Sequence, residues 1–565
     1  MGAWANILPA RFRRRPGGGV GPRASVDDAR GHYSESVFES PYRVASHDRQ
    51  DTVEWNPAFG SADGALLPAR DLAVARVRDV VRNDPVARSA VERLMDAAVG
   101  EGLRLSARPD FEALGITDGE TRRVLKRALQ WEWRAFCDDP RRTCDSQRRL
   151  SMNGLLRLFA RTWFTVGETA AALGWKPGEQ RYATCVLAID PDRVSNPYGT
   201  IDRLTMRGGV EMTDDGEPRG YHVRNAHAGD WWAYGRAWTW TYVPRRTEWG
   251  RPVFIHGFEP DREGMSKAMT PFASLINRLR MIGKFADNEL AAATANALFA
   301  AFVETEAPAD EVAERLTPQR DIHDRRSWMS YLLRWYEKFP AKIGGVRIPV
   351  LAPGSKVTMN ASPRQTTAFP AFQTAFLHSI AASLNLSYEQ LTMDWSRVNY
   401  SSARAALNEV WRSLTRMRAA FAEQVVAPIY YAVIEEAFDR GYIEAPVGAP
   451  DFWDNPGAYL AARWIGPGRG VVDPLKEAEA STMRIENLTS TYEDECAERG
   501  KDYIEVFDQI ALERKELSER GLSRESLVMA TRSTRGPKPD SEEVEEKTGA
   551  EMAAHAQALG DLMAA

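Results

Sequence analysis

The stretch LSYEQLTMDWSRVNYSS, residues 386–402, is polar and has no regular hydrophobic period. Before it, apolar residues recur at helical spacing at Phe369, Phe372, Phe376 and Ile380. After it, a second apolar stripe runs through Leu407, Val410, Leu414, Met417, Phe421 and Val425. A polar, aperiodic segment between two amphipathic helices is typical of a loop held by a rigid scaffold, where functional residues concentrate. The order of segments around this loop decides the fold.

The flanking helices have recognisable start signals. Pro363 starts the first, predicted over 364–385 with Pro370 inside its first turn. Ser401 or Ser402 is a plausible N-cap for the second. Pro428 should kink or restart that helix, because proline removes a backbone donor.

A longer helix is predicted upstream, over residues 267–300, where apolar residues step by three or four. At 1.5 Å per residue it would be about 50 Å long. Its other faces carry Arg278, Arg280 and Lys284 as well as acids. One packed stripe with a large polar surface indicates a helix that spans between domains or packs against copies of itself.

The remaining segments predict an α+β chain that is mainly helical. Helices are expected at 66–82, 85–99, 118–139 and 150–166, and two more between 474 and 530. Short strand patterns cluster at 184–190, 208–223, 238–243 and 252–258. Residues 301–362 form a compact insertion with helices at 308–316 and 327–337 and two short strands joined by Pro353-Gly354.

Composition bounds the function. The chain has 565 residues, 44% of them hydrophobic and 27% charged, which excludes collagen and wholesale disorder. A net charge of −5 excludes a protein that wraps DNA by neutralising phosphates. The Arg-rich first 26 residues and the acidic stretch 531–549 are expected to be flexible tails. No secretory signal is visible, and the longest uncharged apolar run, 290–303, is shorter than the roughly 20 residues of a membrane span.

Motifs for catalysis and cofactors are missing from the sequence. Walker A, GxGxxG, HExxH and GxSxG patterns do not occur, so we expect neither an enzyme nor a cofactor. Four scattered cysteines indicate structural thiols and folding in a reducing cytosol. His222 and His227 lack a third ligand, so no metal site is predicted. The aspartate pairs 190/192 and 214/215 lie in turns, where carboxylates are usually solvated and poor general acids.

Aromatic residues leave alternatives open. The chain has 17 tryptophans, clustered at Trp231, Trp232, Trp238, Trp240 and Trp249. They could form a stacking platform for sugars or single-stranded nucleic acid. The favoured interpretation is that they fill a sheet core or a subunit interface.

Trp395 lies in the polar loop beside Asp394 and Arg397. It either anchors the loop or is displayed as a contact residue. We favour display, because the loop joins two long helices.

Four stretches, in order, carry a resemblance to a known family. Residues 61–105 contain an RxRxxxRNxP core made of Arg76, Arg78, Arg82, Asn83 and Pro85. The second consists of IDPDRV and GGVEMTDDGEPRGYHV. The third and most specific, 383–411, matches through Tyr388, Leu391, Asp394, Asn399, Tyr400, Ser401, Ser402 and Arg404. The fourth, 464–480, carries Asp473, Pro474, Lys476 and Glu477. Together these stretches resemble portal proteins of tailed bacteriophages of the lambda-type family, over roughly residues 45–520.

The sequence departs from the family pattern in two places. Residues 262–272 lack the usual Gln-Arg-Gly before the stem helix, and Asn487 stands where glycine is common. These departures affect the alignment of the stem rather than the resemblance as a whole.

The resemblance implies the portal fold, with wing, stem, clip and crown, assembled as a ring of typically twelve copies. A basic arm would cover 1–45 and the wing 46–262. The stem helices would lie in 263–300 and 363–386, around a clip at 301–362. The channel loop would be 387–401, and the second part of the wing 402–465. A helical crown at 466–530 and a flexible acidic tail at 531–565 would complete the chain.

The implied function is a DNA channel at one capsid vertex of the virion, assembled in the host cytoplasm. Terminase would package the genome through it, and DNA would later leave through it to the tail. Implied partners are other copies, capsid and scaffold proteins, terminase, head-tail connectors and non-specific double-stranded DNA, with no membrane. We expect Asp394, Trp395, Ser396, Arg397 and Asn399 to line the channel, and Arg278, Arg280 and Lys284 to form a polar stem face. The alternatives are a monomeric, Trp-rich glycan-active enzyme and a structural adaptor without DNA.

Overall fold

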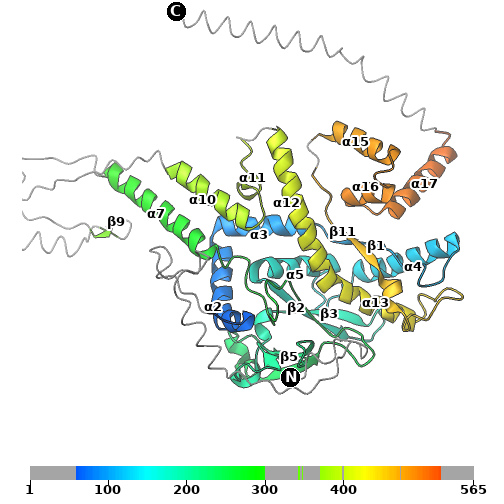
Figure 1. Ribbon diagram of the computed structural model, residues 1–565, viewed down its shortest axis with the longest axis horizontal. Helices are drawn as coiled ribbons and strands as arrows, with labels where there is room; N and C mark the ends of the chain where they lie inside the picture. Colours follow the sequence, from blue (N-terminus) through cyan, green and yellow to red (C-terminus); the bar gives the residue numbers. More distant parts are fainter. Residues whose placement is uncertain are drawn as a thin grey trace, which may run out of the picture. The chain divides into compact units, whose positions relative to one another are not determined.

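The computed structural model describes residues 59–298, 342–343, 346–347, 369–396, 400–470 and 473–522 (Figure 1). The chain divides into two compact units, with the boundary between Pro467 and Gly468. No helix in the described ranges is long and apolar enough to cross a membrane.

The first unit opens with four helices, which confirm the predicted ones. They are α2 (Ala62–Asn83), α3 (Pro85–Ala98), α4 (Gly119–Cys137) and α5 (Met152–Val166). A side chain caps the N-terminus of each: Ser61, Asp84, Asp118 and Ser151 accept backbone N–H groups. Gly100 and Gly102, both with positive φ, follow α3 and end it as predicted.

Seven of the described strands form two antiparallel sheets. The first has the order β3-β2-β8 and contains β2 (Glu168–Trp175), β3 (Thr184–Ile189) and β8 (Phe254–Phe258). The second has the order β4-β5-β6-β7 and contains β4 (Met206–Arg207), β5 (Val210–Met212), β6 (Pro218–Arg224) and β7 (Trp240–Pro244). The predicted strands are confirmed, but β2 was not predicted. Its sequence, ETAAALGW, has three alanines and only one β-branched residue, Thr169, so its strand signal is weak.

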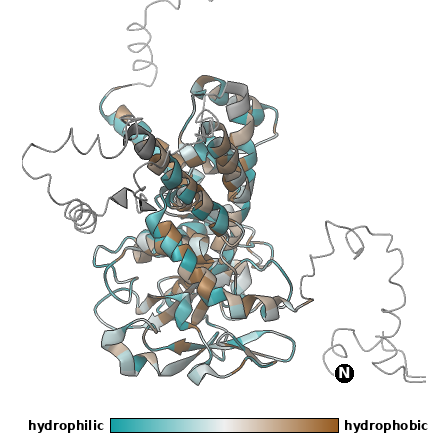
Figure 2. Ribbon diagram, turned by 90° about the vertical axis from the view of Figure 1, so that its left-hand side faces the viewer, coloured by the Kyte–Doolittle hydropathy of each residue, from teal (hydrophilic) through white to brown (hydrophobic). Residues whose placement is uncertain are grey.

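A late strand joins this early part of the chain. Strand β11 (Ala462–Ile465) pairs antiparallel with β1 (Arg104–Ala107). The main apolar core lies between the early helices and those before β11, with Val91, Leu129, Phe159 and Val433 among its fully buried members. Figure 2 shows apolar ribbon gathered in the middle of these elements and hydrophilic ribbon along the loops.

The long helix begins later than predicted. Helix α7 runs Ile276–Leu298, not from residue 267. The backbone N–H groups of Ser266 and Ala268 donate to buried carboxylates instead of to a helix, and Pro271 follows them. Helix α10 (Phe369–Ser383) returns antiparallel alongside α7 (Figure 1). Pro370 is its second residue, which confirms a proline in the first turn.

The predicted loop is partly helical. A short helix, α11 (Tyr388–Thr392), occupies its first half. Helix α12 (Tyr400–Phe421) already contains Ser401 and Ser402, so neither is its N-cap, and that prediction was wrong. A π-helical turn, Ala422–Val426, joins α12 to α13 (Ala427–Asp439). Pro428 therefore restarts the helix as expected, at its first turn, where a missing N–H is tolerated. The short helix α14 (Pro456–Leu460) precedes β11.

The second unit contains three helices where two were predicted. They are α15 (Pro474–Glu486), α16 (Tyr492–Glu498) and α17 (Tyr503–Glu519). Arg484 of α15 donates two hydrogen bonds to Glu495 of α16, at 2.8 and 2.9 Å. These bonds hold the pKa of Glu495 at about 2.

Most of the insertion 301–362 lies outside the described residues, including both of its predicted helices and the Pro353-Gly354 turn. Within it, β9 (Lys342–Ile343) pairs with β10 (Val346–Arg347). The arm 1–45 and the tail 531–565 also lie outside the described ranges.

Candidate functional site

The exposed loop after α11 stands on a short, well-anchored helix. The Ser387 side chain accepts from the backbone N–H of Gln390, and the Gln390 side chain accepts from that of Ser387. This reciprocal capping box starts α11. Leu391 is buried, and its carbonyl oxygen accepts from the Ser89 hydroxyl of α3 at 3.0 Å. Helix α11 is therefore fixed to the core of the first unit.

The loop itself turns outward from that anchor. Met393 ends α11 in the left-handed region, with φ of +59°. The Asp394 carboxylate then accepts from the backbone N–H and the hydroxyl of Ser396, at 3.1 and 2.6 Å. Trp395 keeps 41% of its surface exposed. Asp394, Trp395 and Ser396 thus form one exposed turn, whereas Arg397 and Asn399 lie outside the described residues.

The two long helices are joined by aromatic and polar contacts. Phe285 of α7 lies 5.1 Å from Phe372 of α10, centroid to centroid. The Arg278 guanidinium donates to the Ser379 hydroxyl on α10. Arg280 and Lys284 are exposed on α7. Arg278 therefore ties the pair together, while Arg280 and Lys284 present charge to solvent in the described part of the chain.

A buried charge cluster fixes the chain where it enters α7. Glu168, at the start of β2, is fully buried. Its carboxylate meets Arg70 Nη2 at 2.5 Å, His256 Nε2 at 3.2 Å and Lys267 Nζ at 3.6 Å. It also accepts the backbone N–H of Ala268 at 3.0 Å. We call these four side chains, Arg70, Glu168, His256 and Lys267, the joint cluster.

Hydrogen bonds at both of its ends hold the segment 266–270, which contains Lys267 of the joint cluster, in place. The Ser266 N–H donates to Asp63, and the Thr270 hydroxyl donates to the Thr165 carbonyl at 2.7 Å. Gly167 has φ of +98°, and a Cβ there would lie 2.3 Å from the Met269 carbonyl oxygen. Only glycine allows both this conformation and this close approach.

Electrostatics in the joint cluster favour the charged carboxylate. Burial alone would raise the pKa of Glu168, but Lys267 and Arg70 hold it well below its usual range. Burial lowers the pKa of Lys267, opposed by Glu168. Lys267 Nζ also donates to the carbonyl oxygens of Val194 and Pro191, at 2.6 and 3.2 Å. The joint cluster therefore fixes the segment before α7 to α2 and β2, a role that the sequence did not indicate.

The aspartates considered as catalytic candidates form ion pairs. Arg78 donates to Asp190 at 2.7 Å and to Asp192 at 2.6 Å. Asp192 also lies 3.7 Å from His227 Nε2, and together Asp190, Asp192 and His227 have the spacing of a possible metal cluster. Arg78 binds both carboxylates, and Arg70 Nη2 lies 3.6 Å from Asp192, so cationic side chains already occupy the positions where a metal ion would bind. His222 contacts a different acid, Glu211, at 3.4 Å.

The tryptophan cluster is mostly exposed. Trp231, Trp232 and Trp238 keep 81%, 70% and 54% of their surface exposed. Trp240, the first residue of β7, is partly buried, and its Nε1 donates to the Ser195 hydroxyl at 3.1 Å. A sheet core is therefore the wrong interpretation for the first three.

All four cysteines are free thiols, as expected. Burial raises the pKa of Cys144 to about 12.

Comparison with known proteins decides the family. The family described as phage portal protein, lambda family, matches residues 48–418. The portal protein of Escherichia phage N15 is 33% identical over 475 residues, covering 83% of this chain and 88% of the relative. Portal protein B of Escherichia phage lambda is 32% identical over 473 residues, with the same two coverages. The chain belongs to the lambda family of phage portal proteins.

Chains of a gene transfer agent particle are among the solved structures that match this chain. A chain of the virion of the native particle has a TM-score of 0.37 and 14% identity, covering 77% of this chain and 91% of that chain. A chain of the neck of the native particle, computed with C12 symmetry, has a TM-score of 0.33 and 14% identity, covering 77% and 98%.

Membership of this family gives the chain the portal fold, α+β and mainly helical, and a structural role. Neither a glycan-active enzyme nor an unrelated adaptor is favoured. Two of the family-like stretches also meet in space, since Arg78 of RxRxxxRNxP binds both aspartates of IDPDR. The spacing of two acids around a proline was the only sequence signal for this contact.

Proposed function

We propose that this protein forms a ring, of about twelve copies in the pattern of portal proteins, that serves as the DNA channel at one capsid vertex. Terminase would drive the genome in through the channel, and DNA would leave through it to the tail by way of head-tail connectors. The observation that carries the proposal is 33% identity to a phage portal protein along 83% of the chain.

The arrangement of elements supports this assignment. Two antiparallel helices of the first unit, α7 and α10, lie side by side, and the chain then runs through α11 into an exposed polar turn. We assign α7 and α10 to the stem, 301–362 to the clip, 387–401 to the channel loop, and 46–262 with 402–465 to the wing. The crown would be 466–530, between the wing and the tail 531–565.

The channel chemistry would be physical rather than catalytic. DNA must slide, so tight binding of its phosphates would hinder passage. The loop supplies few charges: Asp394 is engaged with Ser396, and Trp395 adds an uncharged face. We propose that Asp394, Trp395, Ser396, Arg397 and Asn399 face the channel and that Arg280 and Lys284 face it from the stem. Assembly would occur in the host cytoplasm with capsid and scaffold proteins.

Electron microscopy and native mass measurement of the purified protein test the ring. A particle with a central hole supports the proposal, whereas a protein that stays monomeric alone and in procapsids contradicts it. Deletion of residues 392–399 tests the loop. We expect rings to assemble and DNA packaging or retention to fail; an unchanged yield of infectious particles would contradict the loop assignment.

A further inference from the structure

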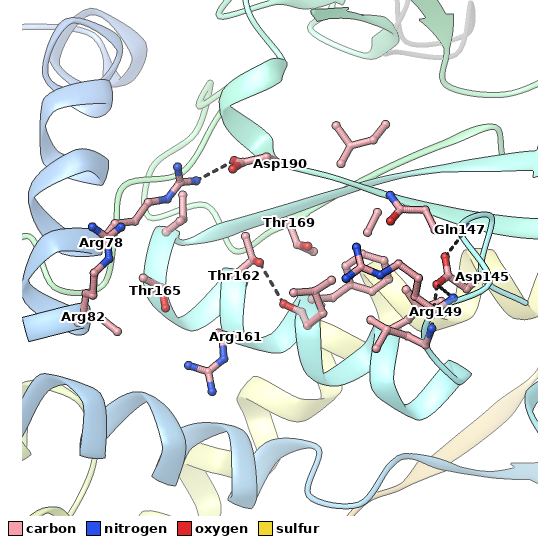
Figure 3. Close-up of a pocket in the computed structure, with 18 of the residues that line it drawn as sticks. Arg78, Arg82, Asp145, Gln147, Arg149, Arg161, Thr162, Thr165, Thr169 and Asp190 are labelled. Atoms are coloured by element: carbon pink, nitrogen blue, oxygen red, sulfur yellow. Dashed lines mark hydrogen bonds and ion pairs between the residues drawn. The ribbon is translucent and has the colours of Figure 1, made fainter. Parts of the chain in front are cut away.

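An arginine-lined pocket of about 760 Å³ lies beside α2, α5 and β3 in the first unit (Figure 3). Arg78 and Arg82 reach it from α2 near one end of α5, and Arg149 lies at the other end of α5. Five arginines line it: Arg78, Arg82, Arg88, Arg149 and Arg161. The lining contains only two acids, Asp145 and Asp190.

The acids near the pocket are already engaged. Asp190 pairs with Arg78, and Glu92 pairs with Arg161 at 2.5 Å. The Asp145 carboxylate accepts three backbone N–H groups of the turn that follows it. Within the described ranges, this leaves the exposed guanidinium groups of Arg82, Arg88 and Arg149 without a hydrogen-bond or ion-pair partner. Guanidinium groups gathered in one pocket favour a ligand that carries carboxylates or phosphates.

An acidic turn of the same chain has the complementary charge. Thr213–Glu217 connects β5 to β6 as a tight turn with Gly216 at φ of +87°. Asp214 and Asp215 are exposed at its tip and have no ion-pair partner in the described part of the chain. Neither aspartate takes part in the ion pairs of Asp190, Asp192 and Glu168.

The turn cannot reach the pocket of its own chain. Strand β6 begins directly after the turn and ends at Arg224, whose carbonyl accepts from Arg193 at 2.8 Å. Beyond that end, His227 contacts Asp192, which binds the pocket residue Arg78. Seven residues of β6, roughly 20 Å at 3.3 Å each, therefore lie between the turn and the end of the strand from which His227 and Asp192 lead to Arg78. An acidic turn of this kind in the pocket would therefore come from another copy.

We infer that, in the ring, the pocket of each copy receives the acidic turn Thr213–Glu217 of its neighbour. The inference rests on the proposed function, because only a ring gives every copy one neighbour on each side. A head-to-tail ring needs two different, complementary patches on each copy, and a pocket and a turn at opposite ends of β6 provide them. Charge complementarity would also fix the register between copies. The apolar floor of the pocket, with Leu155 and Phe159, suits a polypeptide better than a phosphate backbone.

Charge exchange tests the contact. The pocket variant R82D/R149D and the turn variant D214R/D215R should each lower the fraction of protein in rings by about tenfold or more, because like charges would meet. The fourfold variant with both exchanges should restore rings. All four positions are exposed, so the far-ultraviolet circular dichroism and the melting temperature should match those of the wild type.

Two single charge reversals outside the contact control for the direction of the change in net charge. R76E alters an exposed arginine of α2 that does not line the pocket, and E248K alters an exposed acid in another turn. Both should leave the ring fraction unchanged. Light scattering after size exclusion measures the ring fraction in every case.

The outcomes separate this contact from the portal assignment. Normal rings from both charge-reversed variants, or no rescue in the fourfold variant, would overturn the contact and leave the portal assignment intact. If only the pocket variant fails, an acidic ligand other than this turn fills the pocket and the inference is wrong. Absence of rings from the wild type and in procapsids would instead refute the proposed function.

A second measurement reads the contact directly. In R82K protein, a carbodiimide should join the new amine to Asp214 or Asp215. Mixed rings of heavy- and light-isotope copies should give linked peptides with one heavy and one light partner. Links found only within one isotope would contradict a contact between copies.

Discussion

The chain enters and leaves its pair of long helices in two different ways. Before α7, the joint cluster and the buried N–H bonds of Ser266 and Ala268 hold the segment inside the first unit. After α10, one five-residue helix, α11, holds the chain to α3, and an exposed turn follows. A fixed entrance and an exit held by one short helix would suit the proposed stem, which must stay in place, and the proposed channel loop, which must adjust to passing DNA.

The largest effect should come from the entrance. In E168Q, Arg70 and Lys267 would lose their carboxylate while still buried, and breaking a buried ion pair costs about 3–5 kcal/mol. We expect the free energy of unfolding to fall by that amount in urea titrations. E423Q, at an exposed acid, should stay within about 0.5 kcal/mol of the wild type. Equal free energies of unfolding for E168Q and E423Q would show that the joint cluster does not stabilise the fold.

The shifted pKa of Glu168 predicts how the stability of the segment before α7 changes at low pH. The pKa of Glu168 is well below its usual range in the fold, so the unfolded chain binds its proton first as pH falls. Its contribution to stability is present above about pH 4.3, the usual pKa of glutamate, and is lost progressively below it. Unfolding titrations from pH 7 to pH 3 should show a smaller decrease for E168Q than for the wild type.

The exit should respond to a core substitution with a smaller, local loss. Leu391 is 3% exposed, and replacing a buried leucine with alanine costs about 2–4 kcal/mol. In L391A, amide hydrogen exchange should speed up in residues 387–396 and stay unchanged in 266–272. M393A, at an exposed position of the same turn, is the control. Faster exchange in both segments would mean that entrance and exit unfold as one unit.

The sequence predicted these two regions unequally. The loop is recognisable because its lack of periodicity is local, and the capping pair Ser387 and Gln390 could also have been found, since it spans four residues. The joint cluster joins residues that are far apart: Glu168 and Arg70 are separated by 98 positions. A lone glutamate in ETAAALGW gives no indication of its partners. The sequence therefore does not show that Glu168 binds Lys267 and the Ala268 N–H, and the apolar spacing at 267–275 predicts a helix that does not form there. Contacts between distant segments need the folded chain.

A still smaller effect is expected at the start of α11. S387A removes one half of the capping box, and loss of such a cap costs about 1 kcal/mol. S387T keeps the hydroxyl and should behave almost as the wild type. Hydrogen exchange of residues 388–393 distinguishes the two variants, and identical exchange would mean that packing on α3 alone holds α11.

The smallest effect on stability should be at Trp395, and it separates the two interpretations of that residue. Its side chain is 41% exposed, so W395A should change the free energy of unfolding by less than about 0.5 kcal/mol if the indole side chain is displayed to the channel. The change should instead appear in DNA passage, as a lower amount of packaged or retained genome per particle, with W395F close to the wild type. A loss of more than about 1 kcal/mol with normal packaging would show that Trp395 anchors the loop. In that case the contact with DNA would have to come from its neighbours in the turn, and the support of the exit would be stronger than α11 alone provides.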